Sequence, residues 1–164
     1  MSEVEDLNQT ETDPKRVNKA IAYACRILGM REYSQKMLQQ KVLNKGYDLA
    51  ETSQVISFLL ENNWLSDQRF CEVFVRSKVN RGQGLTRIRF ELKEKGISGE
   101  MLDAVLTQQP ICWQDICNQV VERKVSISSL KNNIKARQKL ERFLRYRGFS
   151  GEQVRISINQ YLNK

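Results

Sequence analysis

One short pattern occurs three times in this chain, and it constrains the fold more than any other feature. Each copy has an aliphatic residue, three residues ending in Lys or Arg, a glycine, a large apolar residue and a residue that can cap a helix. The copies span residues 42–48, 92–98 and 144–150. Their glycines lie 50 and 52 residues apart (96 − 46 and 148 − 96). A fixed period of this size indicates an array of tandem structural units.

Each copy carries the signals of one helix ending and the next beginning. Glycine tolerates the left-handed conformation that closes many helices, and a cation before it interacts favourably with the helix dipole. Asp48, Ser98 and Ser150 can then accept backbone N–H bonds as N-caps of the following helices. Asp48 with Glu51, and Ser150 with Gln153, also have capping-box spacing. The pattern therefore predicts a helix–turn–helix junction in each unit.

The apolar periodicity between these junctions is helical. Among these helices, Thr86 is the candidate cap of one, and a long basic helix is expected from roughly Leu130 to Arg147. We divide the chain into a disordered acidic tail at 1–14 and three-helix repeats at 15–64, 65–109 and 110–164. The predicted fold class is all-α, an elongated array of three tandem three-helix repeats for which a curved form is left open. No apolar run is long enough to cross a bilayer, and the N-terminus is acidic, unlike a signal peptide. We therefore expect a soluble, cytoplasmic protein without membrane contact. The even unit lengths and the lack of a strong extra apolar face favour a monomer.

The composition removes most catalytic chemistry. The chain has no histidine, which excludes Ser-His and Cys-His nucleophilic catalysis and histidine ligation of metals. Its four cysteines form no CxxC pair, so we expect reduced, buried thiols. It has no P-loop or dinucleotide motif, and its acidic residues are not clustered as a metal-dependent nuclease requires. We therefore expect no enzymatic activity, no cofactor and no metal site.

The charge is distributed in blocks. Residues 69–95 carry eight bases and three acids, and residues 123–155 carry ten bases and two acids. Residues 96–122 between them carry four acids and no base. Two positive blocks favour two contact surfaces for a polyanion or an acidic protein, while a merely solvated helical surface is the simpler alternative.

Candidate contacts lie in both positive blocks. In the second repeat they are Arg76, Lys78, Arg81, Arg87 and Arg89, and in the third they are Lys135, Arg137, Lys139, Arg142 and Arg145. Lys135, Lys139 and Arg142 are spaced to line one helix face. Arg147 is interpreted as structural because of its place at a helix C-terminus. Tyr146 lies near basic residues, where its ring could stack on a base.

Four segments resemble, in the same order, motifs of the RecX family of regulatory proteins. They are Arg26 to Tyr47, with Ser34 and Gly46; Trp64 to Phe70; Lys78 to Ile97, with its Arg-Gly-Gln-Gly turn; and Arg142 to Phe149. The resemblance covers about residues 17–162. Two departures are Leu85, where the family usually has Pro, and Ser66, where it usually has Asp.

The resemblance implies an all-α, non-enzymatic regulator of the RecA recombinase. Such a protein binds the RecA filament on single-stranded DNA and restrains strand exchange, ATP hydrolysis and the co-protease activity that triggers the SOS response. The candidate cations above would then contact the filament or its DNA, with double-stranded DNA as a further ligand. The alternative from charge alone is a general DNA-binding helical module without a protein partner.

Overall fold

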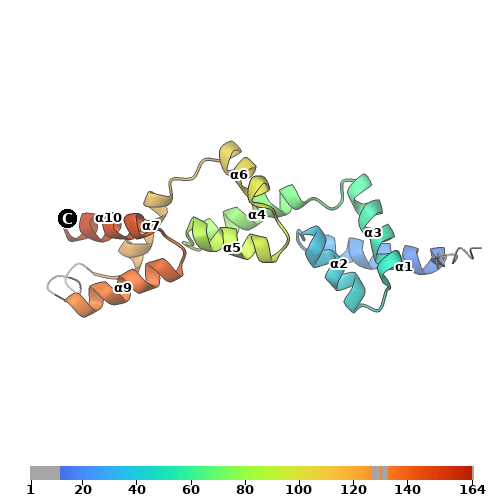
Figure 1. The fold of residues 1–164 in the computed structure, drawn as a ribbon, viewed down its shortest axis with the longest axis horizontal. Helices are drawn as coiled ribbons and strands as arrows, with labels where there is room; N and C mark the ends of the chain where they lie inside the picture. The colour runs from blue at the N-terminus through green and yellow to red at the C-terminus, as the bar shows by residue number, and fades with distance from the viewer. Residues whose placement is uncertain (1–11, 127–129, 131–132, 164) are drawn as a thin grey trace, which may run out of the picture. The chain divides into compact units, whose positions relative to one another are not determined.

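The structure is a computed structural model that describes residues 12–126, 130 and 133–163. This part of the chain is helical and contains no β-strand (Figure 1). The predicted all-α fold is therefore confirmed, whereas residues 1–11 of the predicted tail lie outside the described residues. The described helices are α1 (Pro14–Leu28), α2 (Gln35–Asn44), α3 (Leu49–Glu61), α4 (Asp67–Asn80), α5 (Leu85–Glu94), α6 (Gly99–Gln108), α7 (Trp113–Lys124), α9 (Ile134–Tyr146) and α10 (Gly151–Leu162).

The chain divides into two compact units, Met1–Asp67 and Gln68–Lys164. The first unit contains α1, α2 and α3, which share a core that includes Ala24, Leu38 and Leu59, all fully buried. A buried carboxylate connects the first and third helices of this unit. Glu51 Oε1 accepts a hydrogen bond of 2.5 Å from Arg16 Nε. The main stabilisation of the unit comes from the burial of its apolar side chains.

The second unit contains two three-helix groups. In α4, α5 and α6 the apolar stripes are buried, as at Ile88, Leu92 and Leu102. The last three helices, α7, α9 and α10, form a separate cluster that includes Leu140 and Leu144. A short three-helix repeat can bury only a small apolar core. Packing between the two groups therefore adds to the stability of each.

The repeated glycine pattern has the predicted conformation. Gly46, Gly96 and Gly148 have φ of 100°, 84° and 93°, the left-handed region that disfavours other residues. In the next position but one, Asp48, Ser98 and Ser150 each accept a backbone N–H bond as the N-cap of α3, α6 and α10. The capping boxes at Asp48 and Ser150 are both formed. The three-fold repeat of the sequence is thus a repeat of local structure.

Three local expectations were wrong. Thr86 does not cap α5, because the helix begins at Leu85 and its N-cap is Gly84, which has no side chain to accept a bond. The long basic helix α9 begins at Ile134, capped by Asn133, instead of at Leu130. Cys112 is exposed, whereas the other three cysteines are buried or half-buried. Among the described residues, no helix combines the length and apolar character needed to cross a bilayer.

Candidate functional site

The second and third repeats are joined through their backbones. The amide of Gly84 donates to the carbonyl oxygen of Arg147 at 2.8 Å, and that of Thr86 donates to Gly148 at 3.2 Å. The start of α5 therefore lies against the end of α9, as Figure 1 shows. Amides at a helix start and carbonyls at a helix end lack partners within their own helices. Here each end satisfies the other, which explains why Gly84 needs no capping side chain.

The close approach of the two backbones requires glycine at both position 84 and position 148. A Cβ atom added to Gly84 would lie 2.3 Å from the carbonyl oxygen of Gly148, and one added to Gly148 would lie 2.5 Å from the backbone nitrogen of Arg87. Both contacts are with backbone atoms, which cannot swing away as the end of a side chain can. The Gly82-Gln83-Gly84 segment therefore forms a close backbone junction between repeats.

The side chain of Arg147 also contributes hydrogen bonds to this junction. Its Nη1 atom donates to the carbonyl oxygens of Arg81 and Gly82, the latter at 3.1 Å. Its guanidinium also lies over the ring of Phe143, 4.8 Å from the ring centroid. Hydrogen bonds to a charged group are stronger than neutral ones. The prediction that Arg147 is structural is confirmed, although its partners belong to the preceding repeat.

A groove of about 280 Å³ lies beside this junction and is lined by four cations. The cations are Arg81, Arg123, Lys124 and Arg147, and no acidic residue lines the groove. Lys124 Nζ lies 4.9 Å from the centroid of the Phe143 ring. A concave surface lined by charges of one sign concentrates the electrostatic potential, so this groove favours an anion.

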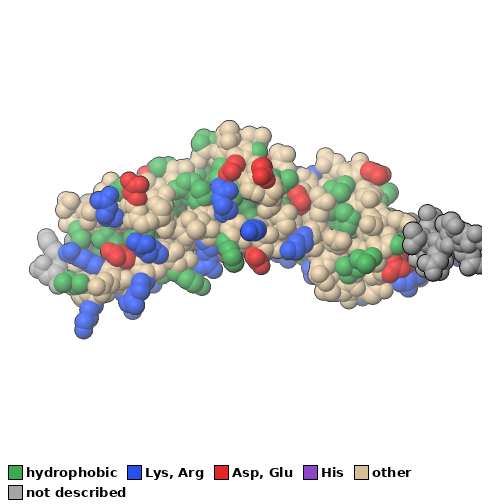
Figure 2. Space-filling view, in the orientation of Figure 1, with side chains coloured by type: hydrophobic (Ala, Val, Ile, Leu, Met, Phe, Trp, Pro, Cys, Tyr) green, Lys and Arg blue, Asp and Glu red, His purple; other side chains and the backbone are tan. Residues whose placement is uncertain are grey.

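The exposed side of α9 is a second basic surface. Lys135, Lys139, Arg142 and Arg145 are all exposed and form no ion pair with any described residue. Lys and Arg side chains gather along the edge of the molecule that α9 occupies (Figure 2). Glu141 is also exposed on α9, but it forms no ion pair with these four cations, so they are available to an external polyanion.

Four other predicted contacts are used within the fold. Lys78 and Arg87 both form ion pairs with Glu91, the Arg87 pair at 2.8 Å. Arg89 Nη2 lies 2.7 Å from Asp103 Oδ1, which connects α5 to α6. Arg137 is half-buried, and its Nε donates to the Leu130 carbonyl oxygen at 3.2 Å. These four side chains have internal partners that an external ligand would have to displace.

The carboxylate of Glu91 is the electrostatic centre of the second repeat. Burial disfavours its charged form, but the hydrogen bonds from Lys78 and Arg87 outweigh burial and hold its pKa below the ordinary value. Glu91 is therefore ionised at neutral pH. It fixes two cations that sequence reasoning had assigned to a ligand.

Arg76 and Arg81 complete the predicted set, and both are exposed. Arg81 lines the cationic groove, together with two cations that sequence reasoning did not select, Arg123 and Lys124. Both belong to the same positive block as α9, so charge alone could have indicated them. Their position opposite Arg81 depends on packing between repeats, for which the sequence has no local signal.

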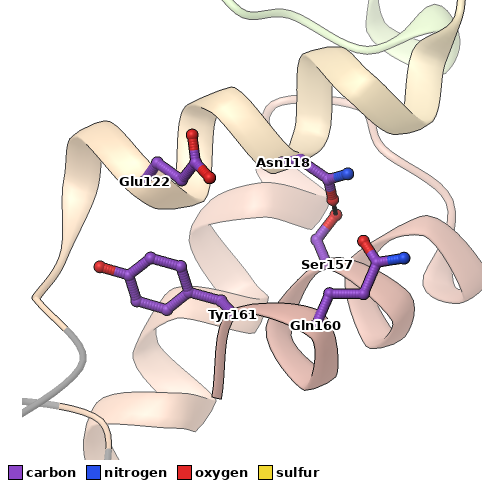
Figure 3. A pocket seen from close by; sticks show the side chains of 5 residues that line it. All are labelled: Asn118, Glu122, Ser157, Gln160 and Tyr161. Carbon is purple, nitrogen blue, oxygen red and sulfur yellow. Dashed lines mark hydrogen bonds between the residues drawn. The ribbon is translucent and has the colours of Figure 1, made fainter. Parts of the chain in front are cut away.

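A smaller cavity, of about 90 Å³, lies between α7 and α10 and is shown in Figure 3. Two of its lining side chains are bonded to each other, since Ser157 Oγ donates to Asn118 Oδ1 at 2.6 Å. A third, Tyr161, donates its hydroxyl to the backbone carbonyl oxygen of Val125 at 2.5 Å. Such a network stabilises helix packing. The described residues contain no group of three or more His, Cys, Asp or Glu side chains that could hold a metal ion.

Comparison with known proteins identifies all three repeats. Residues 20–59 match the family model described as "RecX, first three-helix domain". Residues 66–106 match the second three-helix domain of RecX, and residues 114–156 match the third. The three matches follow the order of the three-helix groups in the structure.

Curated relatives match over most of their length. A protein of Vibrio campbellii named "Regulatory protein RecX" is 34% identical over 136 residues, which are 83% of this chain and 87% of that protein. A protein of the same name from Halorhodospira halophila is 36% identical over 82% of this chain and 83% of its own. The crystal structure of RecX from Lactobacillus salivarius has the same fold, with a TM-score of 0.75 over 91% of this chain and 97% of that chain at 19% identity.

Proposed function

The chain belongs to the RecX family of regulatory proteins, and from this premise we propose that it binds RecA filaments on DNA and inhibits them without any catalytic activity of its own. The inhibited activities are strand exchange, ATP hydrolysis and the co-protease activity that triggers the SOS response. The observation that carries this proposal is the exposed cationic surface on the third repeat, which supplements the family assignment with a surface suited to a polyanion.

The filament offers what these surfaces require. Nucleoprotein presents DNA phosphate and acidic protein side chains repeatedly along its length, and the chain carries cations both in the groove at Arg81 and along α9. Each contact is weak, but once one has formed, the others occur at a high effective concentration. A protein that bridges neighbouring subunits in this way shifts the filament toward whichever state it binds more tightly.

The test is a titration of RecA ATP hydrolysis on single-stranded DNA with the full chain. We expect inhibition at far less than one copy per RecA subunit, because a bound copy that bridges subunits affects more than the subunit it touches. Inhibition that appears only when enough protein is present to cover the DNA would contradict the proposal.

That second result would support the alternative function, a general DNA-binding module. The same cationic surfaces favour it, because phosphate contact by Lys and Arg does not depend on sequence or on a protein partner. The discriminating measurement compares affinity for bare single-stranded DNA with affinity for the same DNA coated by RecA. Tighter binding to coated DNA favours the filament regulator, and equal or weaker binding favours the module. Localisation in the cytoplasm and a monomeric state are part of the proposal.

A further inference from the structure

The cationic stripe on α9 ends in an exposed aromatic ring. Lys135, Lys139, Arg142 and Tyr146 follow one another at intervals of 4, 3 and 4 residues, which places them on one face of the helix. At 1.5 Å per residue, the stripe is about 16 Å long. Tyr146 is 75% exposed, more than almost any other large apolar side chain among the described residues. The ring therefore contributes little to the core.

The ring of Tyr146 borders a groove of about 440 Å³ between α5 and the end of α9. Phe90, on α5, lines the same groove and is 66% exposed. Arg145 and Arg87 also line the groove, together with Glu91, whose carboxylate is paired with Arg87. Two exposed aromatic side chains in one groove expose apolar surface that a chain normally buries, and such grouping marks a binding site.

Arg87 holds the ring of Tyr146 in place. Its guanidinium carbon lies 4.7 Å from the ring centroid, and its Nη1 donates to the Tyr146 carbonyl oxygen at 3.2 Å. Arg87 is itself fixed by Glu91 at 2.8 Å. The ring therefore has a defined position before any ligand arrives, which lowers the entropic cost of stacking a ligand on it.

We propose that this groove receives an unpaired base of single-stranded nucleic acid, stacked on Tyr146 or Phe90, while the adjoining phosphates lie along Lys135, Lys139 and Arg142. Sites for single strands combine cations that follow the backbone with aromatic rings that stack on bases. The inference rests on the proposed function, since it specifies how the chain contacts the DNA of a filament.

Single-stranded nucleic acid fits this groove better than the other ligands of the same charge. In a duplex the faces of the bases are already stacked, so a protein ring can reach only their edges. An acidic protein segment would satisfy the cations but has no general partner for two exposed rings. A single strand supplies both phosphate charge and a free aromatic face at every nucleotide.

The test measures binding of the full chain to two labelled probes by fluorescence anisotropy. One is an oligothymidylate, and the other is a strand of the same length whose sugars carry no bases. We expect Tyr146→Ala to weaken binding to oligothymidylate by about 5- to 100-fold and to leave binding to the abasic strand unchanged. Tyr146→Phe should keep the wild-type affinity for both, because the ring and not the hydroxyl makes the contact.

Lys139→Ala is the matched control on the same stripe. It should weaken binding to both probes by the same factor, because it removes a phosphate contact. Unchanged abasic binding by Tyr146→Ala also shows that the variant is folded.

Two results would overturn the inference: equal losses on both probes with Tyr146→Ala, or unchanged binding to oligothymidylate while inhibition of RecA falls. The latter would assign the groove to a protein partner. The outcome is separable from the proposed function. If the wild-type chain binds bases through Tyr146 but leaves RecA hydrolysis unchanged, the inference stands and the proposed regulation fails.

Discussion

The amide of Gly84 and the carbonyl oxygen of Arg147 are joined by a hydrogen bond of 2.8 Å, although they belong to different repeats. The bond connects the N-cap of α5 to the C-cap of α9, and it needs no side chain from either residue. Only glycine fits at position 84, since any Cβ there would meet the Gly148 carbonyl group.

Gly84→Ala should therefore destabilise the second unit by about 1–3 kcal/mol, because backbone atoms must move to admit the methyl group. Urea unfolding can be followed by the fluorescence of Trp113, which lies in that unit, in a Trp64→Phe background. Gly99→Ala is the control, because its Cβ would meet only the end of Arg89 at 3.5 Å. Equal midpoints for the two variants would show that the close approach is not required.

Arg147→Met should loosen the same junction, because it keeps an unbranched apolar stem but removes the guanidinium group. Two carbonyl groups would lose a charged donor, and we expect a loss of about 1–3 kcal/mol. Hydrogen exchange of the amides of residues 81–87 should become faster. Arg155→Met removes an exposed guanidinium from α10 and should change neither measurement. Unaltered exchange in Arg147→Met would show that the Arg147 side chain does not hold the backbone at residues 81 and 82.

Charge reversal on α9 tests the proposed binding surface. Changing Lys135, Lys139 and Arg142 to Glu should weaken inhibition of RecA and lower the salt-dependence slope of single-strand binding by about 2, since each phosphate contact contributes about 0.7. The helical circular dichroism should not change, because these side chains are exposed.

The control for this triple variant applies the same change of net charge at three other exposed cations, Lys15, Lys19 and Lys93. It should retain most of the inhibition. If both triple variants lose inhibition equally, net charge is responsible and α9 has no special part.

Acid should remove the stabilisation that Glu91 supplies. Its pKa is held below the ordinary value in the folded chain, so its contribution is complete above the unfolded-state pKa and is lost as the pH falls through the folded-state pKa. At pH 7, Glu91→Gln should cost about 1 kcal/mol, and the difference from wild type should shrink as the pH is lowered toward 3. A difference that does not vary with pH would show that the charge is not involved.

The effect of N-terminal truncation on the stability of the first unit should depend on where the chain is cut. Asp13 caps α1 by accepting a bond of 2.9 Å from the Lys15 amide. Removing residues 1–14 should therefore cost about 1 kcal/mol of stability in the first unit, whereas removing residues 1–11 should not. We expect neither deletion to reduce inhibition of RecA, and a large loss with the shorter deletion would give the acidic segment a functional part.

The sequence predicted the features that depend on local spacing. The turns at Gly46, Gly96 and Gly148 and the caps that follow them are short-range, so three neighbouring residues contain the whole signal. The start of α5 was predicted incorrectly because Thr86 is a good capping residue, and the actual solution uses a carbonyl group from another repeat.

The binding surface was predicted less well, because charge pattern does not show which cations already have partners. The Arg87–Glu91 pair has the i, i+4 spacing that stabilises helices and could have been recognised. The pairs of Lys78 with Glu91 and of Arg89 with Asp103 connect different helices. These pairs form only because of how α4 and α6 pack on α5, and short-range sequence patterns do not predict that packing.

The backbone bonds at Gly84 also have a mechanical consequence. The helix that carries the exposed cations, α9, is the one whose final carbonyl groups hold the start of α5. A strand bound to α9, as proposed above, would therefore act on the start of α5 through these two backbone hydrogen bonds and not through flexible side chains. Force on one repeat would reach the other, in keeping with the grouping of both repeats in one compact unit.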